Sequence, residues 1–173
     1  MKQYDFLVIG SGVSGLVFAL EVSKIGKVAI ITKNKLLDCN SSYAQGGVAA
    51  VLSEHDSFDS HINDTYIAGA ELGKKTVIKT IVEDAPKLIN YLVELGVNFT
   101  TDNNRLDKRL ENLALTKEGG HSTKRIVYSA DSTGNEIMEV LIRSCKENSN
   151  IDIYENHIAI DLITQHHILQ DHG

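Results

Sequence analysis

The chain has 173 residues, 42% of them hydrophobic and 23% charged, which suits one globular domain or part of a larger one. A formal net charge of −6 argues against a nucleic-acid surface, and no apolar run approaches the roughly 20 residues that span a bilayer. Two distant cysteines, Cys39 and Cys145, favour free thiols in a reducing compartment. Asp5 precedes a short apolar run, which argues against a signal peptide, so we expect a cytoplasmic protein.

The first predicted elements are a strand, a glycine turn, a helix and a second strand. The apolar run Phe6–Ile9 leads into Gly10, Gly12 and Gly15, which have the spacing GxGxxG. We assign the tight turn to Gly10, the close approach of phosphate oxygens to Gly12, and close helix–strand packing to Gly15. The N–H groups at the start of the helix attract phosphates. This βαβ unit predicts binding of a dinucleotide pyrophosphate.

The same pattern continues toward Gly26, which we expect to cap the first helix before a strand over 27–32. Further helices are predicted over 57–72, 74–95 and 133–145, and further strands over 151–154 and 157–163. In the helix over 74–95, Pro86 predicts a break or the first turn of a new helix, and Gly96 predicts a C-terminal cap. Val77, Ile81 and Val82 are expected to form its inward face. The expected fold is α/β, of Rossmann type, with a parallel sheet that is incomplete. The late histidines His166, His167 and His172 lack a recognisable ligand set, so no metal site is expected.

The choice of dinucleotide stays open from the residues alone. NAD-binding folds usually carry an acidic residue at the end of the second strand, where this chain has Lys33. Lys33 could meet a phosphate of NADP or FAD, or it could be a solvated charge at the strand end.

Two polar, glycine-bearing blocks follow. The block from Asn40 to Val51, NSSYAQGGVAAV, could lie flat against a planar ring, or it could be an ordinary loop. The block from Leu115 to Ile126, LTKEGGHSTKRI, brings charged side chains to a Gly-Gly loop, which could reach a small charged ligand or form a surface turn. Its charged members are Glu118, His121, Lys124 and Arg125.

Together, IGSGVSGL, SSYAQGGVAAV, LTKEGGHSTKRI and ADSTG resemble the flavoprotein family of succinate dehydrogenase and fumarate reductase, most closely its branch that oxidises L-aspartate. The resemblance covers essentially the whole chain, and it implies FAD as cofactor. It implies that the turn holds the pyrophosphate, that Lys33 lies near the adenosine end, and that residues 40–47 line the isoalloxazine ring. The backbone of Ile158 and Ala159 would meet the adenine. The implied cofactor-binding residues are Gly10, Ser11, Gly12, Val13, Ser14, Gly15, Lys33, Asn40, Ser41, Ser42, Tyr43, Ala44, Gln45, Gly46, Gly47, Ile158 and Ala159.

Two positions distinguish the branches of this family. Its membrane-associated members carry a histidine that bonds covalently to the flavin, where this chain has Asn40, so the resemblance implies noncovalent FAD. They also carry an apolar residue where this chain has Glu118. L-aspartate differs from succinate by an ammonium group, for which a carboxylate is the natural partner. The resemblance therefore implies that Glu118 binds the substrate ammonium.

The implied reaction oxidises L-aspartate to iminoaspartate, the first step of quinolinate and NAD biosynthesis, with oxygen or fumarate as electron acceptor and quinolinate synthase as a possible partner. Residues 1–173 would be the N-terminal part of the FAD-binding domain, without the capping and C-terminal helical domains, the catalytic base or the dicarboxylate ligands. We therefore expect no turnover from this part alone. The alternatives are a soluble fumarate reductase or succinate dehydrogenase flavoprotein, and a noncatalytic FAD-binding fragment.

Overall fold

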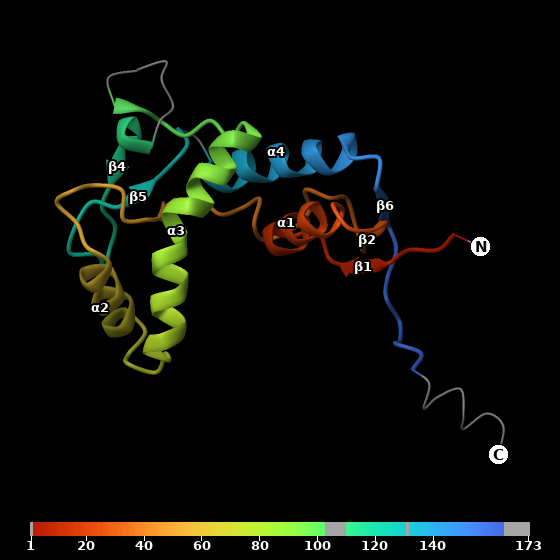
Figure 1. Cartoon of the computed structure of the whole chain (residues 1–173), viewed down its shortest axis with the longest axis horizontal. Helices are drawn as coiled ribbons and strands as arrows, with labels where there is room; N and C mark the ends of the chain where they lie inside the picture. Colours follow the sequence, from red (N-terminus) through yellow and green to blue (C-terminus); the bar gives the residue numbers. More distant parts are fainter. Residues whose placement is uncertain (1, 103–109, 131, 165–173) are drawn as a thin grey trace. The chain divides into compact units, whose positions relative to one another are not determined.

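The computed structural model describes residues 2–102, 110–130 and 132–164 (Figure 1). The chain forms two compact units: residues 1–39 with 142–173 are unit 1, and residues 40–141 are unit 2. The late histidines His166, His167 and His172 lie outside the described residues. Among the residues that are described, no helix combines the length and the apolar character needed to cross a membrane.

Unit 1 contains a three-stranded parallel sheet in the order β1-β2-β6. Its strands are β1 (Phe6–Ile9), β2 (Val28–Thr32) and β6 (Ile151–Glu155). Val28 pairs with both Phe6 and Ile151, so β2 is the central strand. Its run of branched side chains is almost entirely buried, as parallel sheets require. The strands predicted over 6–9, 27–32 and 151–154, and their parallel pairing, are confirmed.

Helix α1 (Val13–Val22) packs against β1 and β2 through the buried side chains Leu16, Ala19 and Leu20 (Figure 1). The prediction that Gly26 caps this helix was wrong, because the helix ends at Val22 and Ser23 is its cap. The hydroxyl of Ser23 donates to the carbonyl of Leu20 over 2.7 Å. Gly26 has a different constraint, since a Cβ there would lie 2.8 Å from a carboxylate oxygen of Asp5.

The second late strand, predicted over 157–163, was also wrong. Within the described part of the chain, no strand follows β6. Asn156 adopts a positive φ of 59°, which turns the chain away after β6, and the N–H of His157 donates to the carbonyl of Thr32. The alternating Ile158, Ile160 and Leu162 that suggested a strand are exposed. The alternation of apolar residues alone did not make a strand, because no neighbouring strand in the described residues pairs with this segment.

Unit 2 contains a small antiparallel sheet in the order β3-β5-β4, formed by β3 (Val48–Ala49), β5 (Ile126–Val127) and β4 (Leu115–Thr116). Gly47, immediately before β3, approaches β5 closely. A Cβ at Gly47 would overlap the side chain of Ile126 and the carbonyl oxygen of Val127. A glycine is therefore required where the polar block turns into the sheet.

Helices α2 (Phe58–Ala68) and α3 (Lys75–Leu95) of unit 2 lie side by side (Figure 1). The hydroxyl of Ser57 caps α2 by accepting the N–H of Ser60 over 3.1 Å. The helix is shorter than predicted, because Ala70 and Glu71 take positive φ angles. The later helix α4 (Thr133–Glu147) begins in unit 2 and ends in unit 1.

Helix α3 continues through Pro86, so the predicted break was wrong. The proline lacks an N–H, yet the helix carries the buried side chains Val82, Ala85 and Ile89 on both sides of it, and this packing compensates for one lost bond. Val77 and Ile81 are exposed, so only Val82 of the predicted inward face is correct. The predicted cap is confirmed, since Gly96 has a φ of 103°.

Candidate functional site

The glycine turn of unit 1 has the geometry that its sequence predicts. Gly10 has a φ of 101°, a conformation that glycine adopts without strain. Gly12 stands in extended conformation as the N-cap of α1. A Cβ at Gly15 would lie 2.5 Å from the carbonyl oxygen of Gly10 and 3.2 Å from Cγ1 of Val8. The first turn of α1 therefore packs directly on β1, and the helix N-terminus is placed at the end of that strand.

The residues around the glycines fit a diphosphate. In the described part of the chain, no side chain caps the start of α1, and the first turn holds no acidic residue. The hydroxyl of Ser11 is buried, donates to the carbonyl of Leu36 over 3.0 Å, and lies 3.1 Å from the hydroxyl of Thr32. The side chain of Ser11 is therefore engaged in structural bonds, while Val13 and Ser14 are exposed.

The other candidate residues of unit 1 lie at the same edge of its sheet. Lys33 follows the end of β2 and is exposed, and Ile158 and Ala159 follow the end of β6. The turn follows β1, so three segments predicted to contact one cofactor all leave the carboxyl ends of adjacent parallel strands. This edge is where open α/β sheets bind their ligands.

Sequence reasoning missed Glu155 at this edge. Its carboxylate accepts the N–H of Leu36 over 2.8 Å and the ammonium of Lys35 over 3.0 Å. These bonds, first the backbone one, lower the pKa of Glu155. Glu155 thereby holds the loop that follows Lys33, and its position at the end of a predicted strand was the available signal.

In unit 2, the segment Asn40–Gly47 is a loop whose exposed members include Tyr43, Ala44, Gln45, Gly46 and Gly47. The start of α4 holds this loop in place. The N–H of Gly134 donates to the carbonyl of Ala44 over 2.9 Å, and a Cβ at Gly134 would overlap that oxygen and the one of Ser41. The glycine of the ADSTG block thus permits close contact between α4 and the loop.

Thr133 adds a second tie that sequence reasoning missed. Its buried hydroxyl donates to the carbonyl of Gly46 over 2.7 Å and accepts the N–H of Ser129 over 3.1 Å. The two hydrogen bonds satisfy the hydroxyl in both roles. They fix the backbone of Gly46, the first glycine of the AQGG sequence.

Glu118 lies beside this glycine. Both of its carboxylate oxygens are 3.4 Å from the position that a Cβ on Gly46 would take. Glu118 opens a tight turn in which the N–H of His121 donates to its carbonyl over 3.3 Å and Gly120 has a φ of 84°. The structure therefore places the carboxylate predicted to bind an ammonium group against the loop predicted to contact the flavin.

Arg125 neither reaches outward for a ligand nor forms part of a surface turn, and both readings of it were wrong. Its side chain is fully buried and pairs with Asp56 through two hydrogen bonds of 2.8 and 2.7 Å. It also donates to Asp64 over 2.7 Å and to Ser60 over 3.1 Å. Burial opposes the charge of Arg125, but the two carboxylates outweigh it and raise the pKa of the guanidinium. The spacing of four between Asp56, which precedes the cap of α2, and Ser60 and Asp64 on the helix was the signal for a polar cluster.

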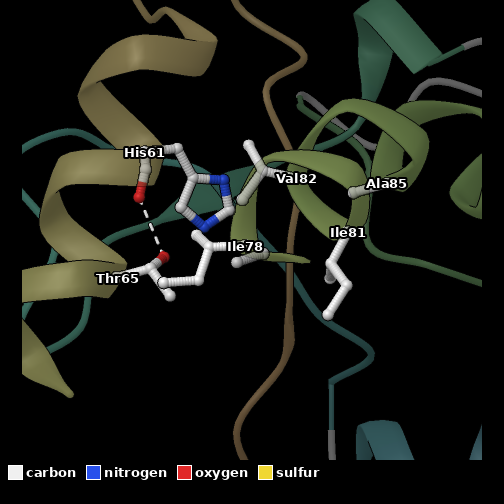
Figure 2. Close-up of a pocket in the computed structure, with 7 residues that line it drawn as sticks. His61, Thr65, Ile78, Ile81, Val82 and Ala85 are labelled. Carbon is white, nitrogen blue, oxygen red and sulfur yellow. Dashed lines mark hydrogen bonds between the residues drawn. The ribbon is translucent and has the colours of Figure 1, made fainter. Parts of the chain in front are cut away.

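His61, on helix α2, faces helix α3 (Figure 2). It is buried and lines a cavity of about 200 Å³ together with Thr65, Ile78 and Val82. Within the described residues, its Nδ1 has no hydrogen-bond partner. Burial, then the charge of Arg125 and the neighbouring His121, lower the pKa of His61, so its imidazole is neutral at pH 7. The residues that line this cavity are mostly apolar, and none of them carries a charge that could bind the ammonium or the carboxylates of an amino acid.

Comparisons with known proteins extend these observations. Residues 5–170 match the family model described as FAD binding domain. The chain is 45% identical to L-aspartate oxidase of Acinetobacter baylyi over 98% of its length, and 47% identical to the chloroplastic L-aspartate oxidase of Oryza sativa over 94%. It spans only 30% and 24% of the length of these two relatives.

Among solved structures, the quinol fumarate reductase of E. coli is similar with a TM-score of 0.82 and 27% identity. The match covers 92% of this chain and 27% of that one. The glycine turn and the strand-edge positions of unit 1 fit a dinucleotide, and the family match identifies it as FAD. The chain therefore belongs to the FAD binding domain family, as a part of the flavoproteins related to fumarate reductase, whose cofactor is FAD.

Proposed function

We propose that the full-length protein is an FAD-dependent oxidase that converts L-aspartate to iminoaspartate. The observation that carries the proposal is the position of the Glu118 carboxylate against Gly46. An anion there suits a substrate that carries an ammonium group, whereas succinate and fumarate offer none. The relatives named L-aspartate oxidase support the same substrate.

The residues of this chain supply binding and orientation. The turn of Gly10, Gly12 and Gly15 binds the diphosphate of the cofactor, and the loop 40–47 contacts its ring. Glu118 accepts hydrogen bonds from the α-ammonium of aspartate and so orients the Cα–H bond. Bound FAD supplies the acceptor for the hydride that leaves Cα. The loss of this hydride and of one proton from nitrogen leaves the C=N bond of iminoaspartate.

The remaining groups belong to the length of the relatives that this chain does not span. We expect there the base and the cationic side chains that bind the two substrate carboxylates. Oxygen or fumarate would reoxidise the cofactor, and quinolinate synthase would consume iminoaspartate in the cytoplasm on the way to NAD.

Anaerobic addition of L-aspartate to the purified full-length protein tests the proposal. The yellow absorbance of the cofactor should bleach with aspartate and stay unchanged with succinate. The alternative is a soluble fumarate reductase or succinate dehydrogenase flavoprotein, which the similarity to quinol fumarate reductase favours. Faster bleaching by succinate than by aspartate would establish that alternative instead.

A further inference from the structure

The turn that carries Glu118 is tied to helix α2 at one carboxylate oxygen. Both the N–H and the hydroxyl of Ser122 donate to Oδ2 of Asp64 over 2.7 Å. Arg125 donates to the same oxygen, also over 2.7 Å. Three donors, including two from the turn itself, therefore converge on a single atom of α2.

Asp64 is well suited to fix a loop. Its side chain is only 14% exposed, and it stands on a helix while its cationic partner Arg125 is held in turn by Asp56. Burial alone would raise the pKa of Asp64, but the bonds from Ser122 and Arg125 outweigh it and keep the pKa below its ordinary value. The carboxylate is thus charged whenever the protein is at neutral pH, and charge-assisted bonds are the stronger ones.

The tie at Ser122 extends to Glu118 through the geometry of the turn. The N–H of His121 bonds to the carbonyl of Glu118, and the ammonium of Lys117 donates to the carbonyl of Ser122 over 3.0 Å. The two ends of the turn are therefore linked to each other and, through Ser122, to α2. The facing Gly46 is held independently by Thr133.

We infer that Asp64 is a positioning residue that sets the place of the Glu118 carboxylate and thereby the preference for an ammonium-bearing substrate over its deaminated analogue. The inference rests on the proposed role of Glu118. Asp64 bonds to Ser122 and Arg125, and we assign it no direct contact with substrate or cofactor. It acts through Ser122, by keeping the turn at a fixed distance from Gly46.

The test uses the full-length holoenzyme with Asp64→Asn, Glu118→Gln and the double variant. The kcat/KM for L-aspartate oxidation and for fumarate reduction is measured on each, together with bound FAD. Asp64→Asn should lower kcat/KM for aspartate about tenfold, mainly through KM, and change fumarate reduction less than about twofold. The double variant should be no worse than Glu118→Gln alone, because both changes remove one interaction.

Two controls separate this role from general stability. Asp59→Asn, an exposed carboxylate in the first turn of the same helix, should leave both activities unchanged. Ser122→Ala removes the hydroxyl bonds to Asp64 and Ser60 of α2 and keeps the backbone N–H bond to Asp64, so it should show the same substrate split to a smaller degree. It decides the question if Asp64→Asn does not fold.

The outcomes distinguish the inference from the proposed function. Equal losses with aspartate and fumarate in Asp64→Asn, or in Ser122→Ala, would overturn positioning, as would additive effects in the double variant. If Glu118→Gln itself fails to separate the two substrates, the role of Glu118 in the proposed function fails, whatever Asp64→Asn does.

Discussion

The carboxylate of Glu118 lies against Gly46, with both oxygens 3.4 Å from the place of a missing Cβ. The two residues are 72 positions apart, and each is held by its own hydrogen bonds: Gly46 by Thr133 and the turn of Glu118 by Asp64. Within the described residues the Glu118 carboxylate forms no ion pair, so a negative charge is presented beside the exposed backbone of Gly46. This arrangement makes the charge available to a ligand.

Removal of that charge should affect aspartate selectively. Glu118→Gln keeps the size of the side chain and should weaken aspartate use by about 1–3 kcal/mol, or roughly 5- to 150-fold in kcat/KM, since one charge-assisted bond is lost. Fumarate reduction by the same protein should change little. Steady-state kinetics with both substrates check this, and a parallel loss would contradict an ammonium-specific role.

Two glycines of unit 2 should respond differently to alanine. Gly134→Ala would force a Cβ into the carbonyl oxygens of Ser41 and Ala44, and should lower the free energy of unfolding by about 1–3 kcal/mol. Gly46→Ala meets only the Glu118 carboxylate at 3.4 Å, so stability should change by less than about 1 kcal/mol while aspartate turnover falls. Urea denaturation and kinetics measure the two quantities. A destabilised Gly46→Ala with a stable Gly134→Ala would refute the described packing.

The glycine turn of unit 1 should control cofactor content. Gly15→Ala places a Cβ 2.5 Å from the Gly10 carbonyl, which pushes the start of α1 from the end of β1. The full-length variant should therefore purify with less FAD and bind added FAD more weakly by fluorescence titration. Gly119→Ala, where a Cβ has nothing within 4 Å, is the matched control and should keep its FAD. Equal FAD content in both variants would argue against the turn as the diphosphate site.

The cofactor should separate from the polypeptide on denaturation. The family resemblance implies that Asn40 takes the place of the histidine that bonds covalently to the flavin in membrane-associated members, and an amide does not form such a bond. Acid precipitation of the holoprotein should therefore leave the yellow colour in the supernatant. Colour that remains in the washed pellet would show a covalent link.

Acidification should destabilise the protein through His61. Burial, Arg125 and His121 lower the pKa of His61 in the folded state, whereas an unfolded chain has a histidine pKa of about 6.5. Above that value neither state is protonated and His61 contributes no pH dependence. Below it the unfolded state binds more protons, so the free energy of unfolding falls as pH decreases.

Urea titrations between pH 8 and pH 5 should show this fall in the parent protein and a flatter profile in His61→Phe. The carboxylate of Asp64 does not interfere, because its pKa is lowered and its effect lies below this range. His55→Gln, at an exposed histidine, should keep the parental slope. An unchanged slope in His61→Phe would exclude His61 as its source.

Local patterns predicted much of the fold because each element carries its own signal. The buried run of β2, the glycine spacing before α1 and the cap at Gly96 need no distant residue to be recognised. The errors came where a pattern depends on its surroundings. Pro86 is tolerated because α3 is packed on either side of it, and the alternating residues after Asn156 have no strand to join.

In the candidate site, too, local features could be predicted from the sequence and contacts between distant residues could not. The glycine turn could be predicted from the sequence, and the three segments at the sheet edge followed from parallel topology. The ties that hold the loops could not, because Arg125 meets Asp56 across 69 positions and Thr133 meets Gly46 across 87. Arg125 reads locally as part of a polar loop and Thr133 as the start of a helix, and only the folded chain shows that both side chains are buried and which partners they bind.

The position of β6 has a consequence for synthesis on the ribosome. β2 is flanked by β1 from the start of the chain and by β6 from residues 151–155, and the 102 residues of unit 2 lie between them. The sheet of unit 1 therefore cannot be completed until unit 2 and β6 have emerged from the ribosome. The three strands of unit 2 are all synthesised before β6, so its sheet can form first. Translation that stalls before Ile151 should leave an unpaired edge on β2, a surface open to aggregation or to chaperones.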